Sequence, residues 1–194
     1  MKRNLLFYSL LAIPLLGVAQ TSKTGIAISE QPYISNVWNP DLGNGMYKNP
    51  VINADYSDPD VICVGDDYYM TASSFNCIPG LPILHSKDLV NWELIGHAVT
   101  KLQPESEFDK PSHGNGVWAP CISYHNGEFY IYWGDPDYGV FMVKTKDPAG
   151  KWEEPVCVIS GKGMIDTSPL WDEDGRVYLV NGWANSRNRF ASVI

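Results

Sequence analysis

The 194-residue sequence has no long hydrophobic run beyond its first twenty residues, and its lysines and arginines form no cluster. A membrane-spanning helix needs about 20 consecutive apolar residues, so the remainder of the chain predicts no membrane span. The formal net charge is −8. An acidic chain without basic patches is not expected to bind nucleic acid or anionic lipid, because both carry negative charge. We therefore expect neither nucleic acid nor a membrane as a partner.

The usual signatures of cofactor and metal sites are also missing. Gly114 and Gly116 are followed by neither a lysine nor a helical pattern, so they predict no phosphate-binding loop. No cysteine lies in a CxxC motif or beside a histidine, so no structural zinc site and no metal ligands are predicted. Free thiols and a disulfide stay open alternatives. The four cysteines are Cys63, Cys77, Cys121 and Cys157.

The N-terminus has the pattern of an export signal. Lys2 and Arg3 precede a mostly apolar stretch, and the small residues 17–19 follow it. This order predicts a signal peptide over residues 1–19, cleaved after Ala19, and hence a periplasmic or secreted protein. A membrane anchor is the alternative, but the apolar stretch is short for it. Residues 20–44 are predicted to be a loose N-terminal leader, and residues 45–194 the folded part.

Three segments of the chain resemble one another. Each has a proline near its start, a short apolar stretch, a polar turn and then an aromatic stretch. Asn-Gly and Asp-Gly turns between such stretches indicate β-hairpins, because both residues tolerate positive φ. Tyr69, Tyr130 and Tyr178 then hold equivalent places. The segments are SDPDVICVGDDYYMTAS, VWAPCISYHNGEFYIYWG and DTSPLWDEDGRVYLVNG.

The second halves of two units also match, since HSKDLVNWELIG resembles VKTKDPAGKWEEPVCV and places Trp92 and Trp152 at equivalent points. No helical period is present beyond one turn near residues 106–110. Self-similarity at a spacing of about 50–60 residues predicts an all-β fold of propeller blades. Residues 45–194 accommodate about three blades, whereas a closed propeller needs about 4–8. We therefore expect the chain to be a truncated part of a larger protein.

Two carboxylates fall at matching points of the repeats. Asp58 and Asp166 precede the aromatic stretches of the first and third units, and Trp118 and Ala119 hold that place in the second. The first strand of a propeller blade lines the central channel, so Asp58, Trp118 and Asp166 are expected to face one another at its mouth. Crowding there is expected to raise the pKa of at least one carboxyl group. This pattern suggests acid/base chemistry on a sugar.

Simpler interpretations exist for each of these residues. Asp58 lies in an Asp-Pro dipeptide, which is common where strands begin. Asp60 is a rival for the same role, although strand alternation places it deeper along the same face. Asp166 would be a local cap if it bonded the amides of the next two residues, and Trp118 would be a core residue if it were buried.

At these residues the chain resembles glycoside hydrolase family 43. The resemblance is carried by NPVINADYSDPDVICVGDDYYMTASSFNCIPGLPILHSKDLVNWELIGH, by GNGVWAP and by GMIDTSPLWDEDGRVYLVNG, within residues 49–183. It implies a five-bladed β-propeller and an inverting, β-xylosidase-like hydrolase acting on plant cell-wall oligosaccharides or polysaccharides. Relatives of that branch often carry histidine or aspartate where this chain has Cys121.

The resemblance also assigns roles to residues. It implies that Asp58 is the general base, that Asp166 orients the general acid and tunes its pKa, and that Phe75 and Trp118 wall the sugar subsite. The acid itself is a glutamate of a later motif that has no counterpart here, so this chain alone is expected to be inactive. No cofactor is implied, and a structural calcium ion stays open. The alternatives are a non-catalytic carbohydrate-binding propeller and an α-L-arabinofuranosidase or arabinanase.

Overall fold

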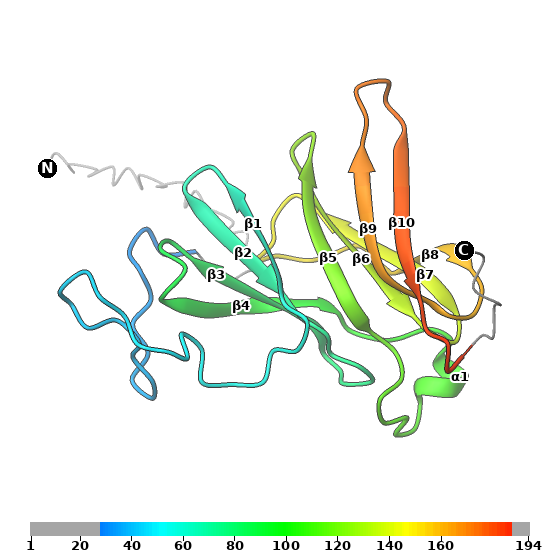
Figure 1. The fold of residues 1–194 in the computed structure, drawn as a ribbon, viewed down its shortest axis with the longest axis horizontal. Helices are drawn as coiled ribbons and strands as arrows, with labels where there is room; N and C mark the ends of the chain where they lie inside the picture. Colours follow the sequence, from blue (N-terminus) through cyan, green and yellow to red (C-terminus); the bar gives the residue numbers. More distant parts are fainter. Residues whose placement is uncertain (1–27, 188–194) are drawn as a thin grey trace, which may run out of the picture.

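The computed structural model describes residues 28–187, and within them the secondary structure is almost entirely β-strand (Figure 1). The strands form two four-stranded antiparallel sheets and one two-stranded hairpin. We call the first sheet blade 1, the second blade 2, and the two-stranded unit the third hairpin. This arrangement confirms the predicted all-β class and repeated units, with two complete blades followed by the first half of another. The predicted signal peptide, residues 1–19, lies outside the described residues.

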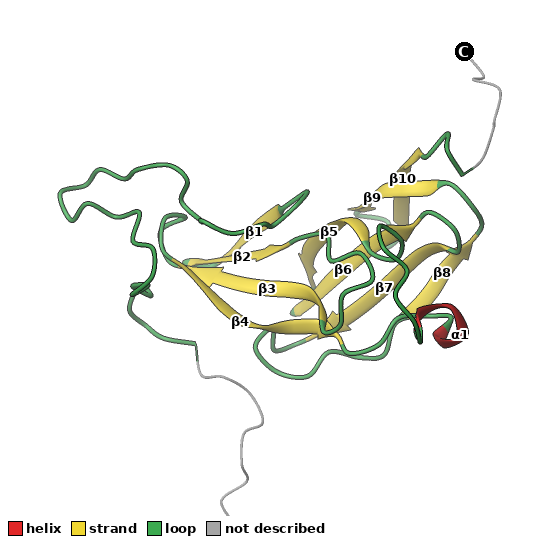
Figure 2. Ribbon diagram, turned by 90° about the horizontal axis from the view of Figure 1, so that it is seen from below, coloured by secondary structure: helices red, strands yellow, loops and turns green. Residues whose placement is uncertain are grey.

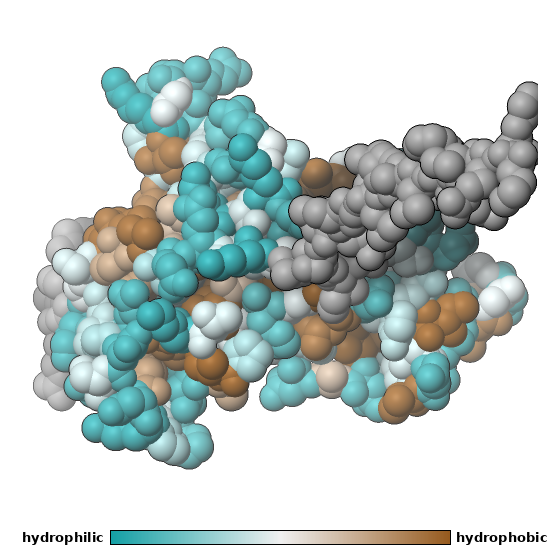
Figure 3. Space-filling view, turned by 180° about the vertical axis from the view of Figure 1, so that it is seen from behind, coloured by the Kyte–Doolittle hydropathy of each residue, from teal (hydrophilic) through white to brown (hydrophobic). Residues whose placement is uncertain are grey.

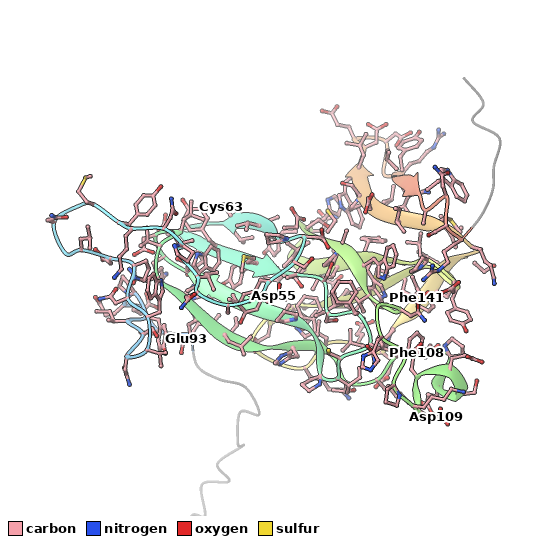
Figure 4. The ribbon with its side chains drawn as sticks, turned by 60° about the horizontal axis from the view of Figure 1, so that its bottom comes forward. Asp55, Cys63, Glu93, Phe108, Asp109 and Phe141 are labelled. Carbon is pink, nitrogen blue, oxygen red and sulfur yellow. The ribbon has the colours of Figure 1, made fainter. Side chains whose placement is uncertain are left out.

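Blade 1 is a meander in which each strand pairs with the next along the chain. Its first hairpin turns at Gly65 and Asp66, and Gly65 has the positive φ that this tight turn requires. The loop before β1 contains Asp55, and Cys63 lies near the other end of β1 (Figure 4). The strands are β1 (Asp60–Val64), β2 (Asp67–Thr71), β3 (Gly80–Ser86) and β4 (Trp92–Val99).

Blade 2 repeats the same meander. Its first turn consists of Asn126 and Gly127, which both have positive φ, as the Asn-Gly pair predicts. Trp92 and Trp152 also hold equivalent places, because each indole N–H donates to a carbonyl three or four residues earlier. The strands are β5 (Trp118–His125), β6 (Glu128–Asp135), β7 (Gly139–Thr145) and β8 (Val156–Ser160).

The third hairpin consists of β9 (Met164–Trp171) and β10 (Val177–Trp183). It projects from the rest of the molecule beside blade 2 (Figure 1). The single helix of the described part is α1 (Glu105–Phe108), one turn long, in the connection between the two blades (Figure 2). The sequence allowed at most one helical turn near residues 106–110, and α1 overlaps that stretch.

The main hydrophobic core lies between the two blades. Leu81, Ile83 and Ile95 of blade 1 face Ile131 and Val143 of blade 2, and all five side chains are almost completely buried. A smaller cluster joins blade 2 to the third hairpin. Its buried members are Tyr132, Val140 and Met164. The blades therefore hold together mainly through removal of apolar side chains from water.

Surface features are less uniform. Exposed apolar side chains on the rear face form separate patches, one of them at the base of the projecting third hairpin (Figure 3). No helix among residues 28–187 is long and apolar enough to cross a membrane.

All four cysteines are free, and Cys63, Cys77 and Cys157 are exposed. Of the two alternatives left open for the cysteines, the described structure has free thiols, and among them Cys121 alone is partly buried.

Candidate active site

The beginnings of the first strands in the three units share an unusual backbone conformation. Asp58, Ala119 and Asp166 have φ values of 49°, 30° and 53°, although none of them is glycine. Left-handed backbone costs a non-glycine residue about 1–3 kcal/mol and is concentrated at functional sites. The three positions are the ones that the repeat alignment equates, so the structure confirms the alignment at the level of the backbone.

Asp58 lies just before β1 and has an exposed side chain. Its Oδ2 accepts a hydrogen bond of 2.7 Å from the hydroxyl of Ser73 and one of 3.0 Å from the hydroxyl of Ser57. No residue within 28–187 donates a hydrogen bond to its Oδ1. One oxygen of the carboxylate is therefore held by the protein while the other is free to act on a ligand or a water molecule.

The contact around Asp58 also joins the two blades. The Oγ of Ser73, just after β2, accepts the backbone N–H of Ala119 on β5 at 2.8 Å. The backbone N–H of Ser73 in turn donates to the carbonyl of Ser57 at 2.9 Å. Asp58, Ser73 and Ala119 thus form a continuous hydrogen-bonded connection from blade 1 to blade 2.

Asp166 lies on β9, on the other side of β5, and its side chain is exposed. Gly182 of β10 makes room for it, because a Cβ on Gly182 would lie 3.1 Å from the Oδ2 of Asp166. The hydrogen bonds of the described residues include none from the amides of Thr167 or Ser168 to this carboxylate. The local cap considered for Asp166 is therefore not present among the described contacts.

A second group of side chains lies two residues further along the same strands. Asp60, Cys121 and Ser168 follow the three positive-φ residues on β1, β5 and β9. The Oδ2 of Asp60 accepts the N–H of Ile122 at 2.8 Å, and the Sγ of Cys121 lies 3.6 Å from the Oγ of Ser168. The first contact joins β1 to β5 and the second joins β5 to β9, so the three strands converge here. Figure 1 shows β5 between the other two strands.

Cys121 is the chemically unusual member of this group. Burial raises the pKa of its thiol to about 11, and the nearby Asp60 carboxylate acts in the same direction, while the contact with Ser168 opposes them. The thiol is therefore protonated at neutral pH and acts as a weak donor rather than a nucleophile. Asp60 accepts a backbone amide and is partly buried, whereas Asp58 is exposed.

The two proposed aromatic walls are brought together by the backbone. Phe75 and Val117 exchange two backbone hydrogen bonds of 3.0 Å, which places Trp118 beside Phe75 at the joint between the blades. Gly116 permits this approach, because a Cβ there would lie 2.4 Å from the carbonyl oxygen of Phe75. Phe75 and Trp118 are both partly exposed, so Trp118 is not a core residue.

Three contributors to this region were not identified from the sequence. Ser73 donates a hydrogen bond to Asp58. In the sequence, the only indication that Ser73 belongs to the site was its position two residues before Phe75. Arg187 lies over the Trp118 ring, with its guanidinium carbon 5.6 Å from the ring centre, and donates to the side chain of Asn115 at 2.9 Å. Neither Arg187 nor Asn115 lies in the repeated part of the pattern, so no sequence signal connected them.

A cavity of about 280 Å³ lies beside the joint and includes Ser57, Ser73 and Phe75 in its lining, but neither Asp58 nor Asp166 borders it. Among residues 28–187 no group of three or more histidine, cysteine or acidic side chains is placed to bind a metal ion. The site is therefore a pair of exposed carboxylates on either side of β5, flanked by two aromatic rings.

Comparison with known proteins gives a consistent result. The model of the family described as "Glycosyl hydrolases family 43" matches residues 47–194. The chain is 37% identical over 159 residues to a β-xylosidase of Formosa agariphila, covering 79% of this chain and 27% of that protein. It is 40% identical over 147 residues to the non-reducing end α-L-arabinofuranosidase BoGH43B of Bacteroides ovatus, covering 74% and 27%.

Solved structures agree with the sequence comparison. The GH43 protein BlXynB from Bacillus licheniformis is similar with a TM-score of 0.60 and 38% identity, over 70% of this chain and 29% of that one. The chain therefore spans little more than a quarter of the length of the relatives that it matches.

Proposed function

The chain belongs to glycosyl hydrolase family 43, and we propose that the complete protein hydrolyses glycosidic bonds of pentose-containing oligosaccharides or polysaccharides with inversion at the anomeric carbon. One observation carries this proposal at the level of the site. Asp58 lies at the joint between the blades, held through Oδ2 and free at Oδ1, beside two partly exposed aromatic rings. The relatives named above include a β-xylosidase and an α-L-arabinofuranosidase.

The mechanism follows from the chemistry of inverting glycosidases. Two carboxyl groups about 6.5–9.5 Å apart leave room for a water molecule between the base and the anomeric carbon. Asp58 removes a proton from that water while a carboxylic acid protonates the leaving oxygen on the other side of the sugar. Asp166 orients this acid, and Phe75 and Trp118 stack against the sugar ring. The acid is a residue that this chain does not supply.

The β-xyloside is the leading substrate and the α-L-arabinofuranoside the second, because both activities occur among the named relatives. A plant cell-wall polymer is the natural source of both linkages. We propose export of the protein because its first nineteen residues have the order of a signal peptide. A non-catalytic carbohydrate-binding propeller is a weaker candidate, because the relatives named above are named as enzymes.

The test uses the complete protein with aryl β-D-xyloside and aryl α-L-arabinofuranoside. Asp58→Asn is expected to lower kcat about 10³-fold while leaving the circular dichroism spectrum unchanged, because an amide cannot accept the proton of water. Asp66→Asn, the same chemical change in the exposed first hairpin turn, is the matched control. NMR of the first product formed is expected to show the inverted anomer.

Three results would contradict the proposal. Turnover by Asp58→Asn at the rate of the unchanged protein would remove Asp58 from the mechanism. Oligosaccharide binding without turnover on either substrate would favour the non-catalytic candidate. Full activity from the 194-residue chain alone would show that the acid lies within it.

A further inference from the structure

We propose that Ser73 is a positioning residue that fixes the carboxylate of Asp58 through Oδ2 and reserves Oδ1 for proton transfer. This inference rests on the proposed function and adds to it a residue that acts through the base rather than on the substrate. It also names which oxygen of Asp58 reacts.

The direction of the Ser73 hydroxyl is determined by its two partners. A hydroxyl has one proton to donate and two lone pairs with which to accept. The N–H of Ala119 points at the Ser73 oxygen at 2.8 Å and can only donate. The single hydroxyl proton is therefore left for Asp58, whose Oδ2 lies 2.7 Å away. That separation is typical of a hydrogen bond from a hydroxyl to an ionised carboxylate.

The two serines near Asp58 differ in what holds them. Ser57 precedes Asp58 in the chain and donates to the same Oδ2 at the longer distance of 3.0 Å. Its hydroxyl has no second partner among the residues described. Ser73 lies fifteen residues away in sequence from Asp58 and is anchored on blade 2 through Ala119. Ser73 is therefore the donor whose orientation the fold determines, and Ser57 is a weaker local one.

The consequence for Asp58 is an asymmetric carboxylate. Oδ2 accepts two hydroxyl protons, whereas Oδ1 accepts none from the described protein, and the Asp58 side chain is exposed. Rotation of the carboxylate about its bond to Cβ would break the short contact with Ser73, so Oδ1 keeps one direction. A general base that already points at its water needs less reorganisation in the transition state. The orientation of the base thus depends on the packing of blade 1 against blade 2.

A purely structural role for Ser73 makes a different prediction. If Ser73 only satisfied the partly buried amide of Ala119, its loss would lower stability without changing how the reaction depends on pH. If Ser73 stabilises the ionised carboxylate, its removal shifts the acid limb of the kcat/KM profile to higher pH, because a hydrogen bond to the charged form favours that form.

The experiment measures kcat, KM and the pH profile of the complete protein with aryl β-D-xyloside and aryl α-L-arabinofuranoside. Ser73→Ala is expected to lower kcat about tenfold with KM nearly unchanged, and to move the acid limb upward by about one pH unit. Ser57→Ala, which deletes the same atoms beside the same oxygen, is expected to have a smaller effect on both. Ser73→Thr keeps the hydroxyl and is expected to restore the profile.

An unchanged acid limb in a folded Ser73→Ala protein overturns the inference, whatever happens to its melting temperature. Equal effects of Ser57→Ala and Ser73→Ala also overturn it. If Ser73→Ala does not fold, Ser73→Cys replaces it, because a thiol still accepts the N–H of Ala119 but is a weak donor. The acid limb is expected to shift upward in Ser73→Cys as well. An unchanged acid limb in that variant overturns the inference. Inactivity of the unchanged protein on both substrates would instead contradict the proposed function.

Discussion

Blade 2 and the third hairpin have the same strand–turn–strand pattern but bury their side chains very differently. Most residues of β6 are buried, whereas most residues of β10 are exposed. The equivalent tyrosines differ less, since Tyr130 of blade 2 is partly buried and Tyr178 is 44% exposed. In the described part of the chain β2 and β6 pair on both sides, whereas β10 pairs only with β9. The repeat determines the strands, but burial depends on what packs against them.

The two regions also contribute differently to the candidate site. Asp58 is connected to blade 2 by the Ser73 hydroxyl, so its surroundings are fixed by two complete sheets. Asp166 is placed by β9 and by the space that Gly182 leaves, with no hydrogen bond to its carboxylate among those described. The joint between blades 1 and 2 therefore holds the proposed base, Asp58, by hydrogen bonds. The third hairpin presents the Asp166 carboxylate without a described hydrogen bond.

The largest expected effect separates the two regions by stability. Val143→Ala on β7 and Val180→Ala on β10 delete the same atoms, from side chains that are 1% and 67% exposed. Val143→Ala is expected to lower the free energy of unfolding by about 2 kcal/mol, because it leaves a cavity in the core. Val180→Ala is expected to cost about 0.5 kcal/mol or less. Urea denaturation of the 194-residue chain measures both, and equal costs would contradict the contrast in packing.

A second prediction concerns pH and the buried Asp135 at the end of β6. Burial raises its pKa to about 6, above the ordinary value of 3.8, although its carboxylate accepts the N–H groups of Asp137 and Tyr138. Because the unfolded chain releases this proton at lower pH than the native chain, the native state binds more protons between about pH 4 and pH 6. Stability attributable to Asp135 is therefore complete below pH 4 and falls as the pH rises through that window.

Asp135→Asn is expected to remove this part of the pH dependence, since the amide oxygen still accepts the two N–H groups and does not titrate. The measurement is the urea midpoint from pH 3.5 to 7 for the variant and the unchanged chain. Asp174→Asn, on the exposed turn of the third hairpin, is the matched control and is expected to leave the profile as it was. A profile that is the same for Asp135→Asn as for the unchanged chain would show that Asp135 does not titrate in this range.

The smallest expected effect tests the backbone conformation common to all three units. Ala119 has a φ of 30°, which glycine adopts without a steric penalty. Ala119→Gly is expected to raise the free energy of unfolding by about 0.5 kcal/mol, because relief of strain exceeds the extra entropy of the unfolded chain. Ala72→Gly, at a buried position without positive φ, is expected to lower it by about 1 kcal/mol. Thermal unfolding measures the stability of both variants. A loss of stability in Ala119→Gly would mean that the backbone at residue 119 is not strained.

Much of the architecture could be predicted from residue order. The Asn-Gly pair at Asn126 places a two-residue turn between β5 and β6, and the matching tryptophans 92 and 152 mark equivalent points of two blades. Short-range turn chemistry and alternation act within a few residues, which is why they can be read from the sequence. The predicted roles of Asp58, Asp166, Phe75 and Trp118 stay predictions, although the structure places all four along the joint between the units.

Residue order alone determined the strands, the turns, the family and the pair of aspartates at matching points of the repeat, because each depends on neighbours in the chain. Tertiary structure alone decided that Ser73 bridges Asp58 and Ala119, that Arg187 covers Trp118, and that Cys121 lies protonated beside Ser168. Those contacts join residues that are 46 to 69 positions apart in three of the four cases. These contacts arise only when the sheets pack side by side. Burial of apolar side chains in the core brings the strands together, whereas local conformational preferences of the chain do not.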